Sequence, residues 1–115
     1  RVTTSSRWGG AAETRELRPA REDSWEHLLT RMETPRALLP IHHRAPPAVR
    51  ERLADSRPQR TVGVVHDPDE YGGEYVQASL SRQFDEVVWF EETGPVTPLD
   101  SEQIEGEPDT YPFGV

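Results

Sequence analysis

Two polar positions at the ends of apolar runs carry the side chains best suited to chemistry. His66 directly follows the run Thr61–Val65, and Glu91 directly follows the run Glu86–Phe90. A histidine that a carboxylate orients is a general base near neutral pH. If the two runs are neighbouring parallel strands, their carboxyl ends meet at the sheet edge where α/β proteins bind ligands. We therefore interpret His66 and Glu91 as substrate-binding residues, with ordinary turn residues as the alternative.

Glu91 and Glu92 do not make an acid–base pair in this arrangement, because consecutive strand residues face opposite sides of a sheet. The acid-rich segment His66–Glu70 lacks the alternating ligand pattern of a calcium loop. The same alternation applies to His42 and His43, so we expect exposed loop histidines there and no metal site.

Several kinds of site are excluded by what the sequence lacks. It has no cysteine, which excludes disulfides, thiolate nucleophiles and thiolate metal sites. It has no G-x-S-x-G elbow, Walker loop, G-x-G-x-x-G turn or H-E-x-x-H motif. We expect no cofactor and assign no catalytic residue.

The element predicted to position His66 and Glu91 is a βαβ unit over Thr61–Thr93. Residues 61–65 and 86–90 are mostly apolar and rich in β-branched side chains. This composition predicts strands of a parallel sheet that are buried on both faces. Between them, Val76, Leu80 and Phe84 recur at i, i+4 and i+8, which predicts a helix. The spacing fits a right-handed crossover connection.

A second helix is predicted over Pro19–Glu33. Asp23 is a suitable N-cap, and Glu26 stands three residues later, the spacing of a capping box. Glu26 would then face solvent, and Pro35 would close the helix. Four apolar residues share the predicted core face: Trp25, Leu28, Leu29 and Met32.

Shorter elements and a loop complete the prediction. The run Arg36–Ile41 contains a proline and is typical of an edge strand, and Pro47 suits the first turn of another helix. A tryptophan before two glycines indicates a turn or a close backbone approach. We predict that this loop borders a substrate cleft, with a tryptophan packed under the loop as the alternative; its residues are Arg7, Trp8, Gly9 and Gly10.

Composition limits the partners and the size of the core. The chain has 115 residues, a hydrophobic share of only 33% and a net charge of -8. An acidic chain lacks the basic patch that nucleic acids and anionic membranes select, so neither is an expected partner. No apolar run approaches the roughly 18 residues of a membrane span, and a cytoplasmic location is expected. Residues 100–115 are rich in proline, glycine and acids and are predicted to be an extended tail.

Five stretches carry a family resemblance: TSSRWGGAAETRELRPAREDSWEHLL, PRALL, RTVGVVHDPDE, YVQASLSRQFDEVVWFEETGPVTPLD and the closing PDTYPFGV. Their order and spacing resemble the C-terminal part of the erythromycin esterase family, from about Thr4 to Leu99. The resemblance implies that residues 1–99 are the C-terminal part of such a domain. The fold class it implies is α/β, a βαβ-containing portion of a larger α/β hydrolase-type domain.

The family implies a metal-independent hydrolase, known best for opening the macrolactone ring of erythromycin-type antibiotics and so for antibiotic resistance. Its chemistry resembles activation of water by a histidine with acidic and arginine partners. In the family those histidines and glutamates lie upstream, including a W-A-H-N-x-H-like stretch, and none of them is carried over here. We therefore expect a small-molecule ester substrate for the full-length parent and an inactive isolated fragment.

Two departures bear on the substrate. Where many relatives have histidines, this chain has Glu74 and Gln77, so the family name does not fix what the protein acts on. A free-standing, non-catalytic binding or interaction module is the alternative function. A fragment is instead expected to expose the apolar faces of four residues: Val62, Val64, Val87 and Phe90.

Overall fold

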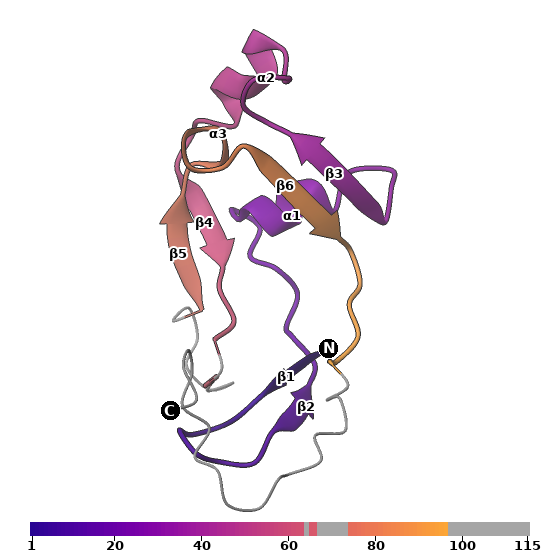
Figure 1. Ribbon diagram of the computed structural model, residues 1–115, viewed down its shortest axis with the longest axis vertical. Coiled ribbons are helices and arrows are strands. Elements are labelled where there is room, and N and C mark those ends of the chain that lie inside the picture. Colours follow the sequence, from indigo (N-terminus) through magenta and orange to yellow (C-terminus); the bar gives the residue numbers. More distant parts are fainter. Residues whose placement is uncertain (64, 67–73, 97–115) are drawn as a thin grey trace, which may run out of the picture.

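Three separate pairs of antiparallel strands make up the sheet structure in the described part of the chain (Figure 1). The computed structural model describes residues 1–63, 65–66 and 74–96. The pairs are β1 (Val2–Thr4) with β2 (Glu13–Arg15), β3 (Arg36–Pro40) with β6 (Glu86–Phe90), and β4 (Arg57–Arg60) with β5 (Tyr75–Ala78). The helices are α1 (Trp25–Leu29), α2 (Pro47–Arg52) and α3 (Leu80–Gln83). Strands and helices are thus mixed along the chain.

The predicted parallel βαβ unit is wrong in its first strand and its direction, and its helix is present only as the short α3. The first strand is β4, which lies just before the apolar run 61–65. Its partner β5 is antiparallel, with Arg60 opposite Tyr75. Within residues 61–65, only Val65 makes a bridge, to Ser5, and Val64 lies outside the described residues. Val76, which was predicted to be helical, is in β5, because its β-branched side chain and the neighbouring tyrosine favour extended backbone. The second predicted strand, Glu86–Phe90, is present, but it is antiparallel to β3 and its residues 88 and 90 are exposed, so its predicted burial on both faces is wrong.

Helix α1 is shorter than predicted and begins at a different cap. Ser24 is the N-cap, and its hydroxyl accepts a hydrogen bond from the backbone N–H of His27. Asp23 instead forms an ion pair with Arg21 through a 2.8 Å contact. The helix ends at Leu29, so Met32 is half-buried in the turn beyond it and is not part of a continuous core face. Leu28 is exposed.

The β3–β6 pair has one covered and one uncovered face. In its register Leu38 lies opposite Val88, and each is 61% exposed. The next pair, Leu39 opposite Val87, turns inward and packs against the core. Together with Phe90, which is also exposed, Leu38 and Val88 form what we call the outer face. Of the four residues expected to be exposed, Phe90 is exposed, Val62 and Val87 are half-buried, and Val64 is not described.

The buried core is small and centres on α1. Its members Trp25, Ile41, Ala78 and Leu80 come from four different segments. The indole Nε1 of Trp25 donates a 2.8 Å hydrogen bond to the carbonyl of Ala78, so α1 is joined to the β4–β5 pair by a buried polar contact as well as by packing. In Figure 1, α1 accordingly lies between the β4–β5 pair and the β3–β6 pair.

The remaining predictions on smaller elements have mixed outcomes. The strand predicted near Arg36–Ile41 is confirmed as β3, and Pro47 does begin α2. The predicted tail, residues 100–115, lies outside the described residues. Among the described helices, none has both the length and the apolar character needed to cross a membrane.

Candidate functional site

A cleft of about 820 Å³ runs beside α1, the end of β6 and the segment that leads from β2 to α1. We call it the β6 cleft. Its lining combines an indole and a phenyl ring with several charged groups of both signs. The lining residues are Arg1, Glu16, Leu17, Arg18, Pro19, Ala20, Glu26, His27, Thr30, Arg60, Trp89, Phe90, Glu91, Glu92 and Thr93. The size and the mixture of apolar and polar groups are typical of a small-molecule site.

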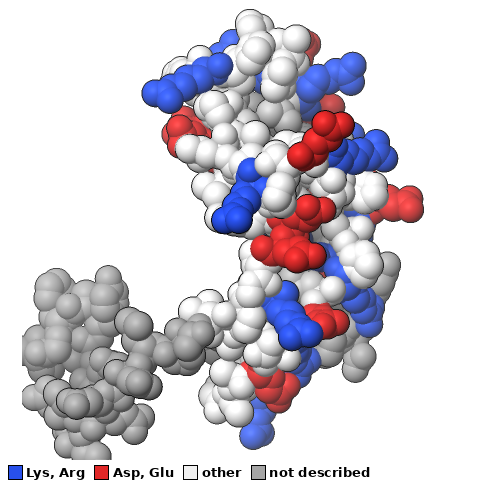
Figure 2. Space-filling model, turned by 90° about the vertical axis from the view of Figure 1, so that its right-hand side faces the viewer, with Lys and Arg blue, Asp and Glu red and all other residues white. Residues whose placement is uncertain are grey.

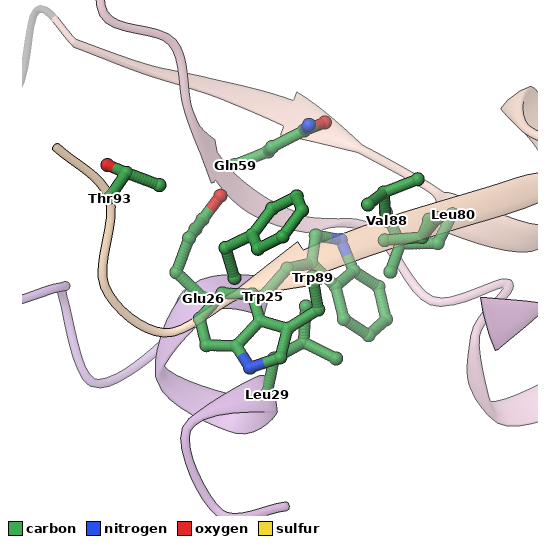
Figure 3. Close-up of a pocket in the computed structure, with 10 residues that line it drawn as sticks. Trp25, Glu26, Leu29, Gln59, Leu80, Val88, Trp89 and Thr93 are labelled. Carbon is green, nitrogen blue, oxygen red and sulfur yellow. The ribbon is translucent and has the colours of Figure 1, made fainter. Parts of the chain in front are cut away.

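A smaller cavity of about 300 Å³ adjoins the β6 cleft, and four residues line both: Glu26, Trp89, Phe90 and Thr93. Figure 3 shows this inner cavity. Thr93, Glu26 and Gln59 carry its polar atoms on one side, and Leu29, Val88, Leu80 and the two indoles form its apolar part. The two cavities thus share a polar and aromatic boundary.

Two buried hydrogen-bonding atoms at this boundary lack a partner among the described residues. They are the Oε2 of Glu26, which can only accept while the carboxyl is ionised, and the indole Nε1 of Trp89, which can only donate. Buried polar atoms are normally satisfied, and an exception calls for an explanation. Both atoms are buried, so a partner would have to reach them from within the cavities that Glu26 and Trp89 line.

The other carboxylate oxygen of Glu26 fixes the side chain. Its Oε1 accepts a 3.0 Å hydrogen bond from the backbone N–H of Arg60. The expectation that Glu26 faces solvent is therefore wrong. Because the cap is Ser24, Glu26 occupies the second position of α1 and points toward β4.

Arg60 connects the β6 cleft to the β4–β5 pair. Its guanidinium donates to the hydroxyl of Tyr75 at 2.7 Å and to the carbonyls of Arg18 and Pro19 at 2.8 and 3.1 Å. It also lies 3.6 Å from Glu74. A planar guanidinium with donors in several directions suits this role, and a lysine would not reproduce it.

His66 lies at the far end of this network and outside the β6 cleft. Its Nδ1 is 3.6 Å from Glu74 Oε2, and both side chains are largely buried. Its backbone N–H donates to Ser5 at 3.0 Å. The carboxylate partner is thus Glu74, not Glu91. The prediction that His66 and Glu91 meet at one sheet edge required parallel strands, and β4 and β6 belong to different antiparallel pairs.

The loop Arg7–Gly10 is a tight turn, as predicted, and it does not line either cavity described above. Gly9 has a positive φ of 71°, which favours glycine. A Cβ on Gly10 would lie 2.6 Å from the hydroxyl of Ser5, so the predicted close approach is present. Trp8 is 82% exposed and is therefore not packed under the loop. Substrate contact by this loop stays a prediction.

Glu91 does line the β6 cleft, and its backbone N–H donates to Pro35 at 2.9 Å. The sequence does not indicate Glu26, His27 or Arg60 as cleft residues. Nothing in the local pattern marks them, since Glu26 and His27 are ordinary residues of a predicted helix and Arg60 only precedes a predicted strand. They converge only through the antiparallel pairings.

The histidine pair His42–His43 departs from the predicted geometry. Both residues follow the end of β3, in a bend rather than a strand, so they need not face opposite sides. Their ring centroids are 4.3 Å apart. The geometric reason for expecting no metal site there is therefore wrong.

Charges of both signs are interspersed over the molecule. On the face drawn in Figure 2, arginines and acidic residues lie next to one another instead of in separate patches. Two ion pairs near β2 are examples, Arg15–Glu13 within the strand and Arg1–Glu16 just beyond it. Exposed pairs of this kind add little stability, but they leave no broad basic surface on this face.

Comparison with known proteins places the chain in a family, although no solved structure matches it. The model of the erythromycin esterase family matches residues 1–93. That match spans most of the 115 residues and includes every strand and helix described above. The chain therefore belongs to the erythromycin esterase family.

Proposed function

We propose that this chain forms part of the substrate cleft of an ester hydrolase whose water-activating histidine lies outside it. Membership in the erythromycin esterase family supports the hydrolase class. The β6 cleft supports a small-molecule substrate, because its volume suits a ligand of drug size. The proposed substrate class is a carboxylic ester, with macrolactones of the erythromycin type as the first candidates to test.

The observation that carries the proposal is the unpaired acceptor and donor on Glu26 and Trp89. A ligand hydroxyl that enters from the cleft can donate to an oxygen such as that of Glu26 or accept from an N–H such as that of Trp89. Macrolactones present hydroxyls on a large apolar ring, and the lining of the cleft combines aromatic and polar groups. This mixture supports a substrate of that polarity.

The proposed role is binding, because the histidines of the described residues are poorly placed for activating water at the cleft. His66 is held by Glu74 outside it. His27 lines the cleft but has no carboxylate in ion-pair contact among the described residues to orient its ring. A general base needs both reach and orientation.

Titration with an erythromycin-type macrolactone, followed by calorimetry, tests this role. We expect saturable binding, weakened by about tenfold in Trp89→Phe, which corresponds to the loss of a single hydrogen bond. Arg52→Gln is the control and should bind like the wild type, because Arg52 is exposed on α2 and lines neither cavity. Mass spectrometry of the ligand should show no added water. Absence of binding, or a ring-opened product from this chain alone, would contradict the proposal.

A non-catalytic interaction module is the second candidate, and the outer face of β3–β6 favours it. Leu38, Val88 and Phe90 present a contiguous apolar surface that is more than half exposed, and such surfaces often mark contact with another protein. This function predicts saturable binding of a protein partner and no binding of macrolactones, so the same calorimetric titration separates the two.

A further inference from the structure

We propose that His42, His43 and Asp85 form a zinc-binding site at one end of the β3–β6 pair, separate from the β6 cleft. One ligand atom from each of the three side chains lies within 4.8 Å of the other two. Ligands bound to tetrahedral zinc at about 2.0–2.2 Å lie about 3.4 Å from each other. Small side-chain rotations therefore bring the three atoms to coordinating distance.

The hydrogen bond of His42 suits a metal ligand. Its Nδ1 is 3.2 Å from the carbonyl oxygen of Ser81. A carbonyl only accepts, so Nδ1 carries the proton, and the lone pair of Nε2 is left for a metal. Metal-ligating histidines usually donate their second ring N–H to a carbonyl or carboxylate in this way.

The backbone holds the two halves of the site together. The carbonyl of Asp85 accepts hydrogen bonds from the backbone N–H groups of Ile41 and His42, at 3.0 and 3.3 Å. The position of Asp85 relative to the histidines is therefore set by the start of β6 and the end of β3. Ser81 is fixed as well, because its hydroxyl donates to the carbonyl of Arg50 in α2 at 2.7 Å.

The set of ligands favours zinc over magnesium or calcium. Arg50 donates to the carbonyl of His42 at 3.4 Å, and Arg82 borders the same surface cavity as His42, as does Glu51. Net positive surroundings weaken every cation, and magnesium and calcium depend on oxygen ligands, of which the cluster has a single carboxylate. Imidazole nitrogens bind zinc strongly.

Zinc at this site would link the end of β3 to the residue before β6, close to the small buried core. Binding only to the folded state raises its stability by mass action. The inference does not depend on the proposed function, since none of the three ligands lines the β6 cleft.

Calorimetry and thermal melting with zinc chloride, on the untagged full chain, test the site. We expect a single saturable site and a higher melting temperature with zinc. Asp85→Asn and His43→Gln should each weaken zinc binding by about tenfold or more, and both positions are exposed, so folding should survive. Asp55→Asn and His27→Gln are the matched controls and should bind zinc like the wild type.

Cobalt substitution and magnesium competition complete the test. Cobalt should give visible absorption bands typical of bound nitrogen ligands, and these should be absent in His42→Gln. Excess magnesium should not displace zinc. No zinc binding, equal loss in His27→Gln, or displacement by magnesium would overturn the assignment.

Discussion

Glu26 on α1 accepts a 3.0 Å hydrogen bond from the backbone N–H of Arg60 on β4, and this contact joins elements 34 residues apart. It leaves one carboxylate oxygen of Glu26 tied to the fold and the other buried without a partner among the described residues. The same side chain thus supports the structure and faces both cavities.

Replacing Glu26 by alanine should lower the free energy of unfolding by about 1–3 kcal/mol, because the part-buried N–H of Arg60 loses its acceptor. Glu26→Gln retains an acceptor and should cost less. Denaturant unfolding of the two variants measures the difference. Glu22→Ala is the matched control, since Glu22 is exposed, and should change the stability by less than about 0.5 kcal/mol. Equal effects of Glu26→Ala and Glu22→Ala would contradict the contact.

Trp25 and Trp8 should respond very differently to the same substitution. Trp25→Phe removes a buried hydrogen bond to Ala78 and part of a fully buried ring, so we expect a loss of about 2–4 kcal/mol. Trp8→Phe changes a side chain that is 82% exposed and should be near neutral. Thermal or denaturant unfolding of the two variants measures the difference in stability. Comparable losses of stability in both variants would contradict a core centred on Trp25.

The register of β3 and β6 predicts that two neighbouring valines differ in how much their substitution lowers the stability. Val87 packs against the core, so Val87→Thr should destabilise the chain by about 1–2 kcal/mol. Val88 lies on the outer face, so Val88→Thr should leave the stability nearly unchanged. It should also lower the binding of a hydrophobic dye, which fluorescence measures. A one-residue shift in register would reverse the two results.

The ion pair between Asp23 and Arg21 predicts a lowered pKa for the Asp23 carboxyl. A hydrogen bond from Arg21 lowers the pKa of the Asp23 carboxyl below its ordinary value of 3.8. Because the folded pKa lies below the unfolded one, the contribution to stability is present above the unfolded pKa and is lost as the pH falls through the folded pKa. Carboxyl NMR titration should show Arg21→Gln moving the pKa back toward 3.8. Arg15→Gln should leave it in place.

Local patterns in the sequence predicted local elements better than their pairing. The strand Glu86–Phe90 and the helix start at Pro47 depend on short-range composition, and both are present. The apolar run before His66 predicted a buried strand. An apolar run does not determine which backbone groups it pairs with, however, and the strand is instead β4, the segment directly before the run. Asp23 and Ser24 are adjacent and both are residues that can cap a helix. In the structure Ser24 is the N-cap of α1.

The candidate site was less predictable than the fold. Glu91 was identified from its place after a strand, and it lines the β6 cleft. The position of Trp89 depends on which face of β6 turns inward, and the pairing with β3 determines that face. The histidine pair His42–His43 was judged as if the strand continued, whereas Pro40 ends it.

The central claim is that the β6 cleft binds an ester ligand at Trp89. The chain has three tryptophans, and each gives an indole N–H signal in a two-dimensional NMR spectrum. On titration with an erythromycin-type macrolactone, the signal of Trp89 should shift. A shift of the Trp8 signal alone, or no shift at all, would contradict the account.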